Sequence, residues 1–315
     1  MIISLVLYCI YLYSIYKITE FILYFLNIFY KYYIRKPLDL NKRYGNKSYV
    51  LITGATDGIG KSISEMFSKE HFNLILVGRN NSKLLKAKND ITNNLNIKNF
   101  NSIDIITVYF DFSKMYSIDD YNNKFKDIIN DYNVSILVNN VGIIAHDMYL
   151  NNTKGENLEE LINVNIKSQV FLTKLFLNKI KEDNNKSNNH KLIINLSSFA
   201  SDLNSNRNTI YGSTKSFNNH FSKIINYELK FDKKLKQKVD VMSVKPSYVS
   251  TNMCKLSPNF YSIITEKQFV NHLRKLIGYE SETYGHIYHQ IRSDLLIKYL
   301  PKIIVNYWNI NYRFC

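Results

Sequence analysis

Cysteine and glycine are scarce in this chain of 315 residues, with 3 and 10 occurrences. The cysteines, Cys9, Cys254 and Cys315, are odd in number, widely spaced and in no CxxC pair. The sequence therefore suggests neither a disulfide framework nor a zinc site, and a body that faces a reducing compartment fits best. His286 and His289 also lack a partner at metal-ligand spacing, so we expect no metal and a strand or loop role for both.

Contiguous basic blocks and internal repeats are absent as well. The net charge is +15, but the lysines are interleaved with asparagine, isoleucine and tyrosine instead of forming runs. This pattern argues against a nucleic-acid partner and favours a biased composition together with an anionic membrane surface. The lack of a repeat excludes a solenoid.

Two apolar runs, Met1 to Tyr16 and Phe21 to Tyr30, occupy the N-terminal end. They predict a membrane anchor over residues 1–36 with lipid as a partner, since Lys17 can extend its amine to the interface. A cleaved signal peptide fits less well, because a basic start and a small-residue cleavage pattern are missing. Cationic residues follow the apolar runs, which keeps the next domain on the cytosolic side. They are Lys31, Arg35, Lys36, Lys42 and Arg43.

From Ser48 onward, short β-branched runs alternate with stretches that carry apolar residues at helical spacing. The predicted strands are Tyr49 to Ile52, Asn73 to Val77, Ile105 to Phe110, Ser135 to Val138, Leu192 to Asn195 and Val239 to Val244. The predicted helices include Ile59 to Lys69, Leu158 to Lys181 and Thr209 to Phe231. This alternation predicts an α/β fold of the Rossmann type, a doubly wound and mainly parallel sheet with helices on both faces.

Three segments follow from these patterns. We expect a catalytic domain over residues 45–290, including a substrate lid at about 251–285, and an apolar tail over 291–315. Lys298, Pro301 and Lys302 interrupt the tail, so a helix at the membrane interface and an ordinary packing segment fit equally well. Lys181 to His190 is polar and rich in asparagine, which predicts a surface loop.

Three of the ten glycines, Gly54, Gly58 and Gly60, lie where a buried strand turns into a helix. Gly54 suits the tight turn, Gly58 allows a diphosphate to approach the backbone, and Gly60 permits close packing of helix on strand. The helix that follows offers free N–H groups and a positive dipole to phosphate. The segment therefore predicts a dinucleotide site.

Arg79 ends the second predicted strand, where such a fold contacts the adenosine ribose. An arginine there can pair with a 2′-phosphate, so NADPH is the expected cofactor. Asp111, at the end of the third predicted strand, can accept from the adenine amino group or cap a helix that begins near Ser113.

A Tyr-x-x-x-Lys pattern occurs three times, at Tyr13/Lys17, Tyr32/Lys36 and Tyr211/Lys215. Only Tyr211 and Lys215 lie on a predicted helix of the α/β region, with Ser198 upstream at a strand end. Reduction of a carbonyl needs a proton donor and a second donor that polarises the oxygen. Tyr211 and Ser198 suit these roles, and Lys215 should lower the pKa of the tyrosine.

Several motifs occur in the order and spacing of one known family. They are Thr53-Gly54-x-x-x-Gly58-Ile59-Gly60, Asn139-Asn140-Val141-Gly142, Asn163-Val164-Asn165, Ser197-Ser198, Tyr211-Gly212-Ser213-Thr214-Lys215 and Pro246-Ser247-Tyr248-Val249-Ser250-Thr251. Together they resemble the short-chain dehydrogenase/reductases from Tyr49 to Met253. The resemblance implies a catalytic tetrad of Asn165, Ser198, Tyr211 and Lys215, in which Asn165 holds a relay water. It implies cofactor contacts from Gly54, Thr56, Asp57, Gly58, Ile59, Gly60, Arg79, Asp111, Asn139, Tyr211, Lys215, Pro246, Val249 and Thr251.

Within this family, the glycine turn, Val141 and the anchor look like the very-long-chain 3-oxoacyl-CoA reductases and the related 17β-hydroxysteroid dehydrogenases. The resemblance implies NADPH-dependent reduction of a 3-oxoacyl-CoA in fatty-acid elongation at the endoplasmic reticulum membrane, with the domain facing the cytosol. Reduction of a ketosteroid is the alternative, and a non-catalytic NADPH-binding scaffold subunit is an alternative of another class. A homodimer and elongase-complex partners are expected by analogy. Ser247 departs from a glycine that is common after the proline, and the C-terminus lacks a dilysine retrieval signal.

Overall fold

The chain divides into two compact units, Met1–Pro37 and Leu38–Cys315. We describe them from a computed structural model that covers residues 2–97, 103–144, 149–182, 189–203, 208–254, 256–258, 263–301 and 304.

The first unit is one helical segment, α1 (Ile2–Phe29), continued by the π-helix η1 (Tyr30–Ile34). The polar residues between the two apolar runs do not break it, because Lys17 forms an ion pair with Glu20 at 2.8 Å, one turn further on. The stretch Ile2–Ile34 has 33 residues and a mean hydropathy of 1.6. It is long and apolar enough to cross a membrane.

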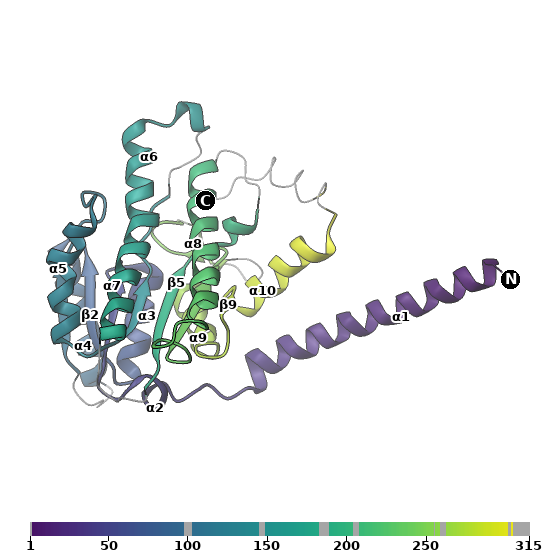
Figure 1. Cartoon of the computed structure of the whole chain (residues 1–315), viewed down its shortest axis with the longest axis horizontal. Coiled ribbons are helices and arrows are strands. Elements are labelled where there is room, and N and C mark those ends of the chain that lie inside the picture. Colours follow the sequence, from purple (N-terminus) through teal and green to yellow (C-terminus); the bar gives the residue numbers. More distant parts are fainter. Residues whose placement is uncertain are drawn as a thin grey trace. The chain divides into compact units, whose positions relative to one another are not determined.

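The second unit is built on a parallel sheet of seven strands in the order β3-β2-β1-β4-β5-β6-β9. Strands β2, β5 and β9 of this sheet are labelled in Figure 1. Its strands are β1 (Tyr49–Thr53), β2 (Asn73–Gly78), β3 (Ile105–Tyr109), β4 (Val134–Asn139), β5 (Lys191–Leu196), β6 (Val239–Val244) and β9 (Glu282–Thr283). All neighbouring strands pair in parallel. The Rossmann-type fold expected from the sequence is thus confirmed, and the nearly continuous apolar runs of the central strands suit burial on both faces.

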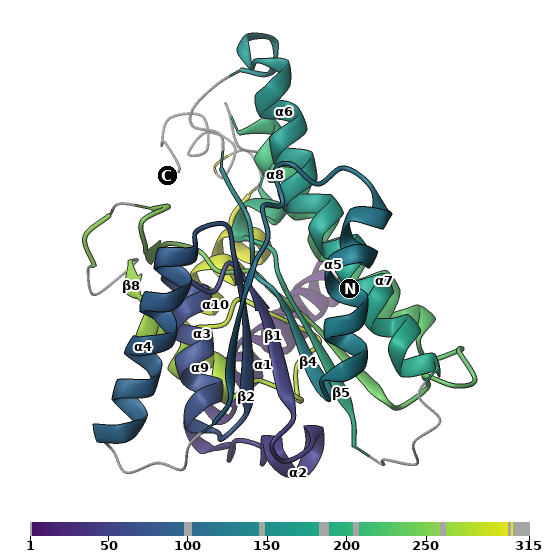
Figure 2. The ribbon, with the colours of Figure 1, turned by 90° about the vertical axis from the view of Figure 1, so that its left-hand side faces the viewer.

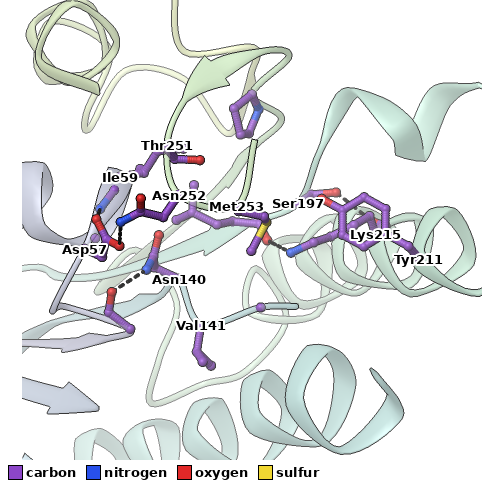
Figure 3. A pocket seen from close by; sticks show the side chains of 16 residues that line it. Asp57, Ile59, Asn140, Val141, Ser197, Tyr211, Lys215, Thr251, Asn252 and Met253 are labelled. Atoms are coloured by element: carbon purple, nitrogen blue, oxygen red, sulfur yellow. Dashed lines mark hydrogen bonds between the residues drawn. The ribbon is translucent and has the colours of Figure 1, made fainter. Parts of the chain in front are cut away.

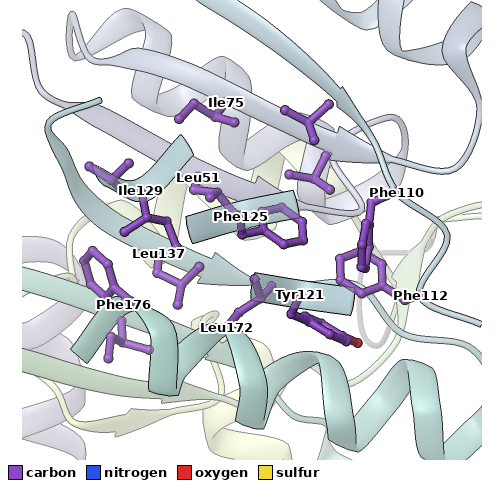
Figure 4. Close-up of a cluster of buried hydrophobic side chains, with 14 of the residues drawn as sticks. Leu51, Ile75, Phe110, Phe112, Tyr121, Phe125, Ile129, Leu137, Leu172 and Phe176 are labelled. Carbon is purple, nitrogen blue, oxygen red and sulfur yellow. The ribbon is translucent and has the colours of Figure 1, made fainter. Parts of the chain in front are cut away.

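Helices cover both faces of this sheet (Figure 2). One face carries α3 (Gly58–Lys69), α4 (Asn81–Ile97) and α9 (Glu266–Arg274), and the other carries α5 (Ile118–Asp131), α7 (Ser168–Glu182) and α8 (Thr209–Glu228). Beneath α5 and α7, Phe125, Ile129, Leu172 and Phe176 pack with strand residues such as Leu137 (Figure 4).

Shorter elements complete the second unit. They are α2 (Leu40–Tyr44), η2 (Leu150–Asn152), α6 (Gly155–Ile162), the π-helix η3 (Asn163–Lys167), η4 (Phe199–Asp202), β7 (Val249–Ser250), β8 (Ile264–Thr265), α10 (Ile287–Asp294) and η5 (Leu295–Tyr299). The single helix expected from Leu158 to Lys181 is therefore interrupted by a π-turn. Most of the Asn-rich loop and of the apolar tail lies outside the described residues.

Candidate active site

A cavity of about 260 Å³ opens at the carboxyl ends of the strands, where the chain order of the sheet reverses between β1 and β4. Ligands of open α/β sheets bind at such switch points. Its lining comes from the loops after β1, β4, β5 and β6, from α8 and from the segment after β7. The lining residues are Gly54, Asp57, Gly58, Ile59, Gly60, Asn140, Val141, Gly142, Leu196, Ser197, Tyr211, Lys215, Pro246, Thr251, Asn252 and Met253.

The glycine turn has the backbone that the spacing predicted. Gly54 and Gly58 have φ values of +64° and +53°, in the left-handed region that favours glycine. A Cβ atom on Gly60 would overlap the carbonyl oxygen of Gly54 and the side chain of Asn140. Asp57 caps α3 by accepting from the N–H of Gly58 at 2.7 Å. The cradle is thus open to a diphosphate and closed to a side chain, so a dinucleotide fits here.

Adjacent asparagines after β4 point to different places. Asn140 donates to the carbonyl oxygens of Thr53 and Gly54, at 2.8 and 3.2 Å, and lines the cavity. Asn139, the expected cofactor residue, donates instead to Thr173 and Asn195 and is buried. Successive side chains of a strand point to opposite faces of the sheet, so the two asparagines have different surroundings. The sequence pattern placed the contact on Asn139, whereas Asn140 is the residue at the cavity.

The four predicted catalytic residues lie in one region of the molecule. Lys215 is buried on α8, where its Nζ donates to the carbonyl oxygen of Leu196 at 2.9 Å and lies 5.8 Å from the ring centroid of Tyr211. Tyr211 is hydrogen-bonded to the side chain of Ser198. The Ser198 hydroxyl also caps η4, accepting from Ala200 N at 3.1 Å. Figure 3 shows Tyr211 and Lys215 across the cavity from Asp57.

Asn165 lies in the π-turn η3, a type of distortion that is frequent at functional sites. Its side chain accepts from the N–H of Ile143 at 2.8 Å and donates to the carbonyl oxygen of Ile143 at 2.9 Å. It also donates to Thr214 on α8 at 3.1 Å. A Cβ atom on Gly142 would lie 3.1 Å from Lys215 Nζ and 3.4 Å from Asn165 Oδ1, so both side chains flank this glycine.

Burial dominates the titration of the tyrosine and the lysine. Desolvation raises the pKa of Tyr211, and the hydrogen bond from Ser198 opposes this in part. Desolvation lowers the pKa of Lys215 to about 8. The expected lowering of the pKa of Tyr211 by Lys215 is therefore absent, because loss of phenolate solvation is the larger effect in this geometry.

A second cavity of about 130 Å³ shares Ile59, Tyr211, Pro246, Thr251 and Met253 with the first. Apolar groups form much of its wall. Its other lining residues are Ile144, Ser198, Phe199, Ala200, Asn208, Ser247, Tyr248, Val249 and Cys254. Tyr211 thus borders both spaces, and Ser198 borders the second. Within the segment predicted as a lid, α9 packs on α3 and β9 joins the sheet. The described lid residues that line the second cavity are Thr251, Met253 and Cys254.

Asn252 and Met253 were not predicted from the sequence. The Asn252 amide donates to the carboxylate of Asp57, which links the segment after β7 to the start of α3 (Figure 3). This bond crosses the mouth of the cavity between residues 195 positions apart in sequence. No local sequence pattern indicates a contact between Asn252 and Asp57. The available signal was that Asp57 lies within the glycine turn and that Asn252 directly follows the 246–251 motif.

Five predicted cofactor residues do not line the first cavity. Asn139 is buried, as described above, and Val249 lines the second cavity. The other three are Arg79, Thr56 and Asp111. Arg79 is exposed and its Nη1 lies 3.5 Å from a carboxylate oxygen of Glu160. Thr56 packs beside Gly78, just before Arg79. Asp111 accepts from both the N–H and the hydroxyl of Ser113. The expected helix near Ser113 is wrong, because α5 starts later, at a capping box formed by Ser117 and Asp120.

His289 and Cys254 differ from expectation. His289 lies on α10, whereas His286 lies in the loop before that helix and caps it, in agreement with the expected loop role. Among the described residues no group of three His, Cys, Asp or Glu side chains could hold a metal ion. Cys254 is disulfide-bonded, which its wide spacing from the other cysteines did not suggest.

The arrangement defines a class of protein. A dinucleotide cavity at the switch point, a second cavity beside it and a buried tyrosine and lysine between them are the parts of a nicotinamide-dependent oxidoreductase. The family model described as short chain dehydrogenase matches residues 48–260. The chain belongs to this family, and it is an NAD(P)-dependent oxidoreductase.

Individual relatives cover most of the chain. The very-long-chain 3-oxoacyl-CoA reductase of Mus musculus is 30% identical over 250 residues, which are 78% of this chain and 74% of that protein. A Caenorhabditis elegans protein provisionally named steroid dehydrogenase 4 is 30% identical over 259 residues, 81% of this chain and 92% of that one.

Solved structures share the fold. A short-chain dehydrogenase from Sphingobium yanoikuyae in complex with NADPH has a TM-score of 0.61 at 20% identity and covers 75% of this chain and 87% of its own. A 3-ketoacyl-(acyl-carrier-protein) reductase from Brucella melitensis complexed with NADH has a TM-score of 0.62 at 19% identity and covers 75% and 93%.

Proposed function

We propose that the protein is an NADPH-dependent ketoreductase that reduces long-chain 3-oxoacyl-CoA to 3-hydroxyacyl-CoA. The observation that carries the proposal is the position of Tyr211, which borders both cavities and is hydrogen-bonded to Ser198. Reduction of a ketone requires hydride on carbon and a proton on oxygen at one place. A phenol between a dinucleotide space and an apolar space meets that requirement.

Each of the four residues has a role in this proposal. NADPH, when bound, supplies the hydride. Ser198 donates a hydrogen bond to the substrate oxygen, and Tyr211 delivers the proton to it as negative charge develops. Lys215, whose Nζ donates to the carbonyl oxygen of Leu196, would contact the nicotinamide ribose and return a proton toward Tyr211. Asn165 belongs to the proton relay that the family resemblance implies, beside Gly142 and Lys215.

The choice of NADPH depends on Arg79. Arg79 follows Gly78 at the end of β2, and the partner of its guanidinium is the carboxylate of Glu160. A 2′-phosphate can replace that carboxylate with a more highly charged acceptor. The 2′-hydroxyl of NADH offers no such exchange.

The choice of substrate depends on the second cavity and on the relatives. Ile144, Phe199, Val249 and Met253 give it an apolar wall that suits a hydrocarbon chain next to Ser198. The mouse relative is named a very-long-chain 3-oxoacyl-CoA reductase, which favours the thioester. A ketosteroid is the second candidate, favoured by the name of the Caenorhabditis elegans relative.

The setting follows from the first unit. We propose that Ile2–Ile34 anchors the protein in the endoplasmic reticulum membrane with its body on the cytosolic side. A substrate with a long acyl chain partitions at the same bilayer. A homodimer and contacts with other elongation enzymes belong to the same proposal.

A substrate panel tests this function. The full chain in detergent is supplied with NADPH and with a long-chain 3-oxoacyl-CoA or a ketosteroid, and NADPH oxidation is followed. We expect kcat/KM for the thioester to exceed that for the steroid by about tenfold or more, equal to about 1.4 kcal/mol of transition-state stabilisation. The opposite order would transfer the assignment to ketosteroid reduction.

A further inference from the structure

A cation on α10 lies directly behind the wall of the second cavity. The guanidinium carbon of Arg292 is 5.0 Å from the ring centroid of Tyr248, and its Nη1 lies 3.5 Å from the hydroxyl oxygen of Ser247. Arg292 is also hydrogen-bonded to the side chain of Tyr248. Ser247 and Tyr248 line the cavity together with Ser198 and Tyr211. Arg292 therefore belongs to the substrate side of the site.

Arg292 differs from three other partly buried cations of this unit, each of which has a carboxylate partner. Arg43 pairs with Asp240, Arg274 with Glu70, and Lys245 with Asp202 and Glu282. Within the described part of the chain, no carboxylate lies within 4.0 Å of the Arg292 guanidinium. The nearest acidic residue on its own helix, Asp294, is paired with Lys298.

The loop in front of Arg292 is held in place by a neutral histidine. His289 accepts from the N–H of Ser247 at 3.3 Å, and its other ring nitrogen lies 3.2 Å from the carbonyl oxygen of Tyr248. The bonding of both ring nitrogens fixes Ser247 and Tyr248 against α10. Arg292 thus lies behind a braced loop of the cavity wall, where a partly buried charge is costly unless an anion joins it.

We propose that Arg292 binds a phosphate group of the carrier that delivers the acyl thioester, an inference that rests on the proposed function. A long-chain 3-oxoacyl-CoA carries its phosphates beyond the pantetheine arm, away from the reacting carbonyl. Arg292 lies behind the wall of the second cavity and not beside Tyr211, which suits phosphates that are remote from the reacting carbonyl. The planar guanidinium can donate two hydrogen bonds to one phosphate, and stacking on Tyr248 orients it for this. An unmodified ketosteroid has no anion to offer.

Paired substrates test the inference. One is a 3-oxoacyl-CoA, and the other is the same acyl group on N-acetylcysteamine, which keeps the thioester and lacks the phosphates. With the detergent-solubilised full chain, we expect Arg292→Gln to raise KM for the CoA substrate about tenfold with little change in kcat. KM for the N-acetylcysteamine substrate should stay within about twofold, and Arg292→Lys should retain part of the CoA preference.

Two controls separate charge from folding. Lys126→Gln removes one exposed positive charge from α5 and should leave both KM values unchanged. For the wild type, free coenzyme A should inhibit reduction of the N-acetylcysteamine substrate more strongly than pantetheine does, which needs no variant. If coenzyme A and pantetheine inhibit equally, Arg292 has no phosphate to bind.

The possible failures are distinguishable. If the wild type reduces neither thioester but reduces a ketosteroid, the proposed function fails before any variant is compared, and this inference fails with it. If the wild type reduces both thioesters and Arg292→Gln changes both KM values equally, the function stands. The phosphate contact is then wrong, and Arg292 only supports Tyr248.

Discussion

Tyr211 is the residue at which catalysis can be separated from binding. Because its hydroxyl is the proposed proton donor, Tyr211→Phe should lower kcat by about 10²- to 10⁴-fold while NADPH affinity stays within about twofold. Tyr13 belongs to the same sequence pattern but lies exposed on α1, so Tyr13→Phe is the matched control and should keep full activity. Steady-state rates and NADPH fluorescence titration measure both quantities. Unchanged ketone reduction in Tyr211→Phe would favour the scaffold alternative.

Arg79 should decide between the two cofactors. Removing its charge in Arg79→Gln should weaken NADPH binding by about tenfold, the range expected for one charge-assisted hydrogen bond at an exposed site, and leave NADH binding unchanged. Glu160→Gln removes the competing carboxylate and should not weaken NADPH binding. Titration of both variants with both cofactors is the measurement. An equal loss for NADPH and NADH would mean that Arg79 acts only by shaping the turn.

For individual residues, the sequence predicted which segments form the site better than the directions in which their side chains point. The glycine turn and the Tyr211–Lys215 pair were found because their spacing is local. The choice between Asn139 and Asn140 depends on which of two neighbours faces the core, and Thr173 and Asn195, far away in sequence, decide it. The pKa of Tyr211 depends on burial, which a spacing pattern does not contain.

Among the elements, those with strong local patterns were predicted well. The strand from Val239 to Val244 was predicted with its observed bounds. Each of the other five predicted strands differs from its observed strand by at most one residue at either end. The two-residue strands β7, β8 and β9 were not predicted, because they depend on pairing with distant segments. The π-turn η3 was also missed, since the apolar spacing around it continues as in an ordinary helix.

One buried ionic network joins three elements near the site. Lys245, which follows β6, has its Nζ 2.8 Å from Asp202 of η4 and 2.6 Å from Glu282 of β9, and Tyr284 donates to Asp202 at 2.8 Å. Lys245→Met would leave both carboxylates without this cation. We expect a loss of about 2 to 3 kcal/mol of stability, less than for a fully buried pair because both carboxylates keep some exposure.

Thermal unfolding in detergent measures this loss, with Lys61→Met as the matched control. Lys61 pairs with Asp90 between two partly exposed side chains, so its loss should cost under about 1 kcal/mol. A fall in Tm several times larger for Lys245→Met is the expected result. Equal falls would show that the network contributes no more than a surface pair.

The histidines around α10 predict a dependence of stability on pH. Burial lowers the pKa of His272 to about 4, of His286 to about 3 and of His289 to about 4. In the unfolded chain each titrates near 6.5, so between pH 6.5 and about 4 the unfolded state binds more protons and stability falls as pH falls. Above about pH 6.5 these groups contribute no dependence. Carboxylates with lowered pKa values, such as Asp90 and Asp232, act mainly below this window.

Tm at pH 7.5, 6.5, 5.5 and 4.5 tests this dependence, each histidine contributing up to about 1.4 kcal/mol per pH unit. His289→Gln keeps an acceptor and a donor for Ser247 and Tyr248 but does not titrate. Its Tm should fall less steeply with acid than that of the wild type. Parallel curves would show that His289 is not protonated on unfolding in this range.

For the whole molecule, family and fold were predictable while the substrate was not. The family motifs follow one another in fixed order along the chain, so their sum is specific even though each is weak. The second cavity combines residues of the 246–251 motif with Ile144, Phe199, Met253 and Cys254, which belong to none of the motifs and meet only in the folded unit. The apolar lining of this cavity and the place of Arg292 behind it therefore depend on contacts that form only on folding.

The two units should attach the protein to membranes by different forces. Residues 38–315 contain 37 lysines and arginines against 25 acidic residues, so this unit alone has a formal charge of +12. Deletion of residues 1–37 should leave a protein that binds anionic vesicles at low salt and is released at about 0.5 M NaCl, because screening weakens exposed charges. The full chain should stay with the vesicles at the same salt, since burial of Ile2–Ile34 in hydrocarbon is insensitive to screening.

Vesicle flotation with both proteins measures this difference in salt sensitivity, and reduction of a short, water-soluble 3-oxoacyl thioester checks that the shortened protein is folded. Release of the full chain by salt would mean that the helix lies outside the bilayer, and a mature N-terminus beyond residue 34 would identify it as a cleaved leader.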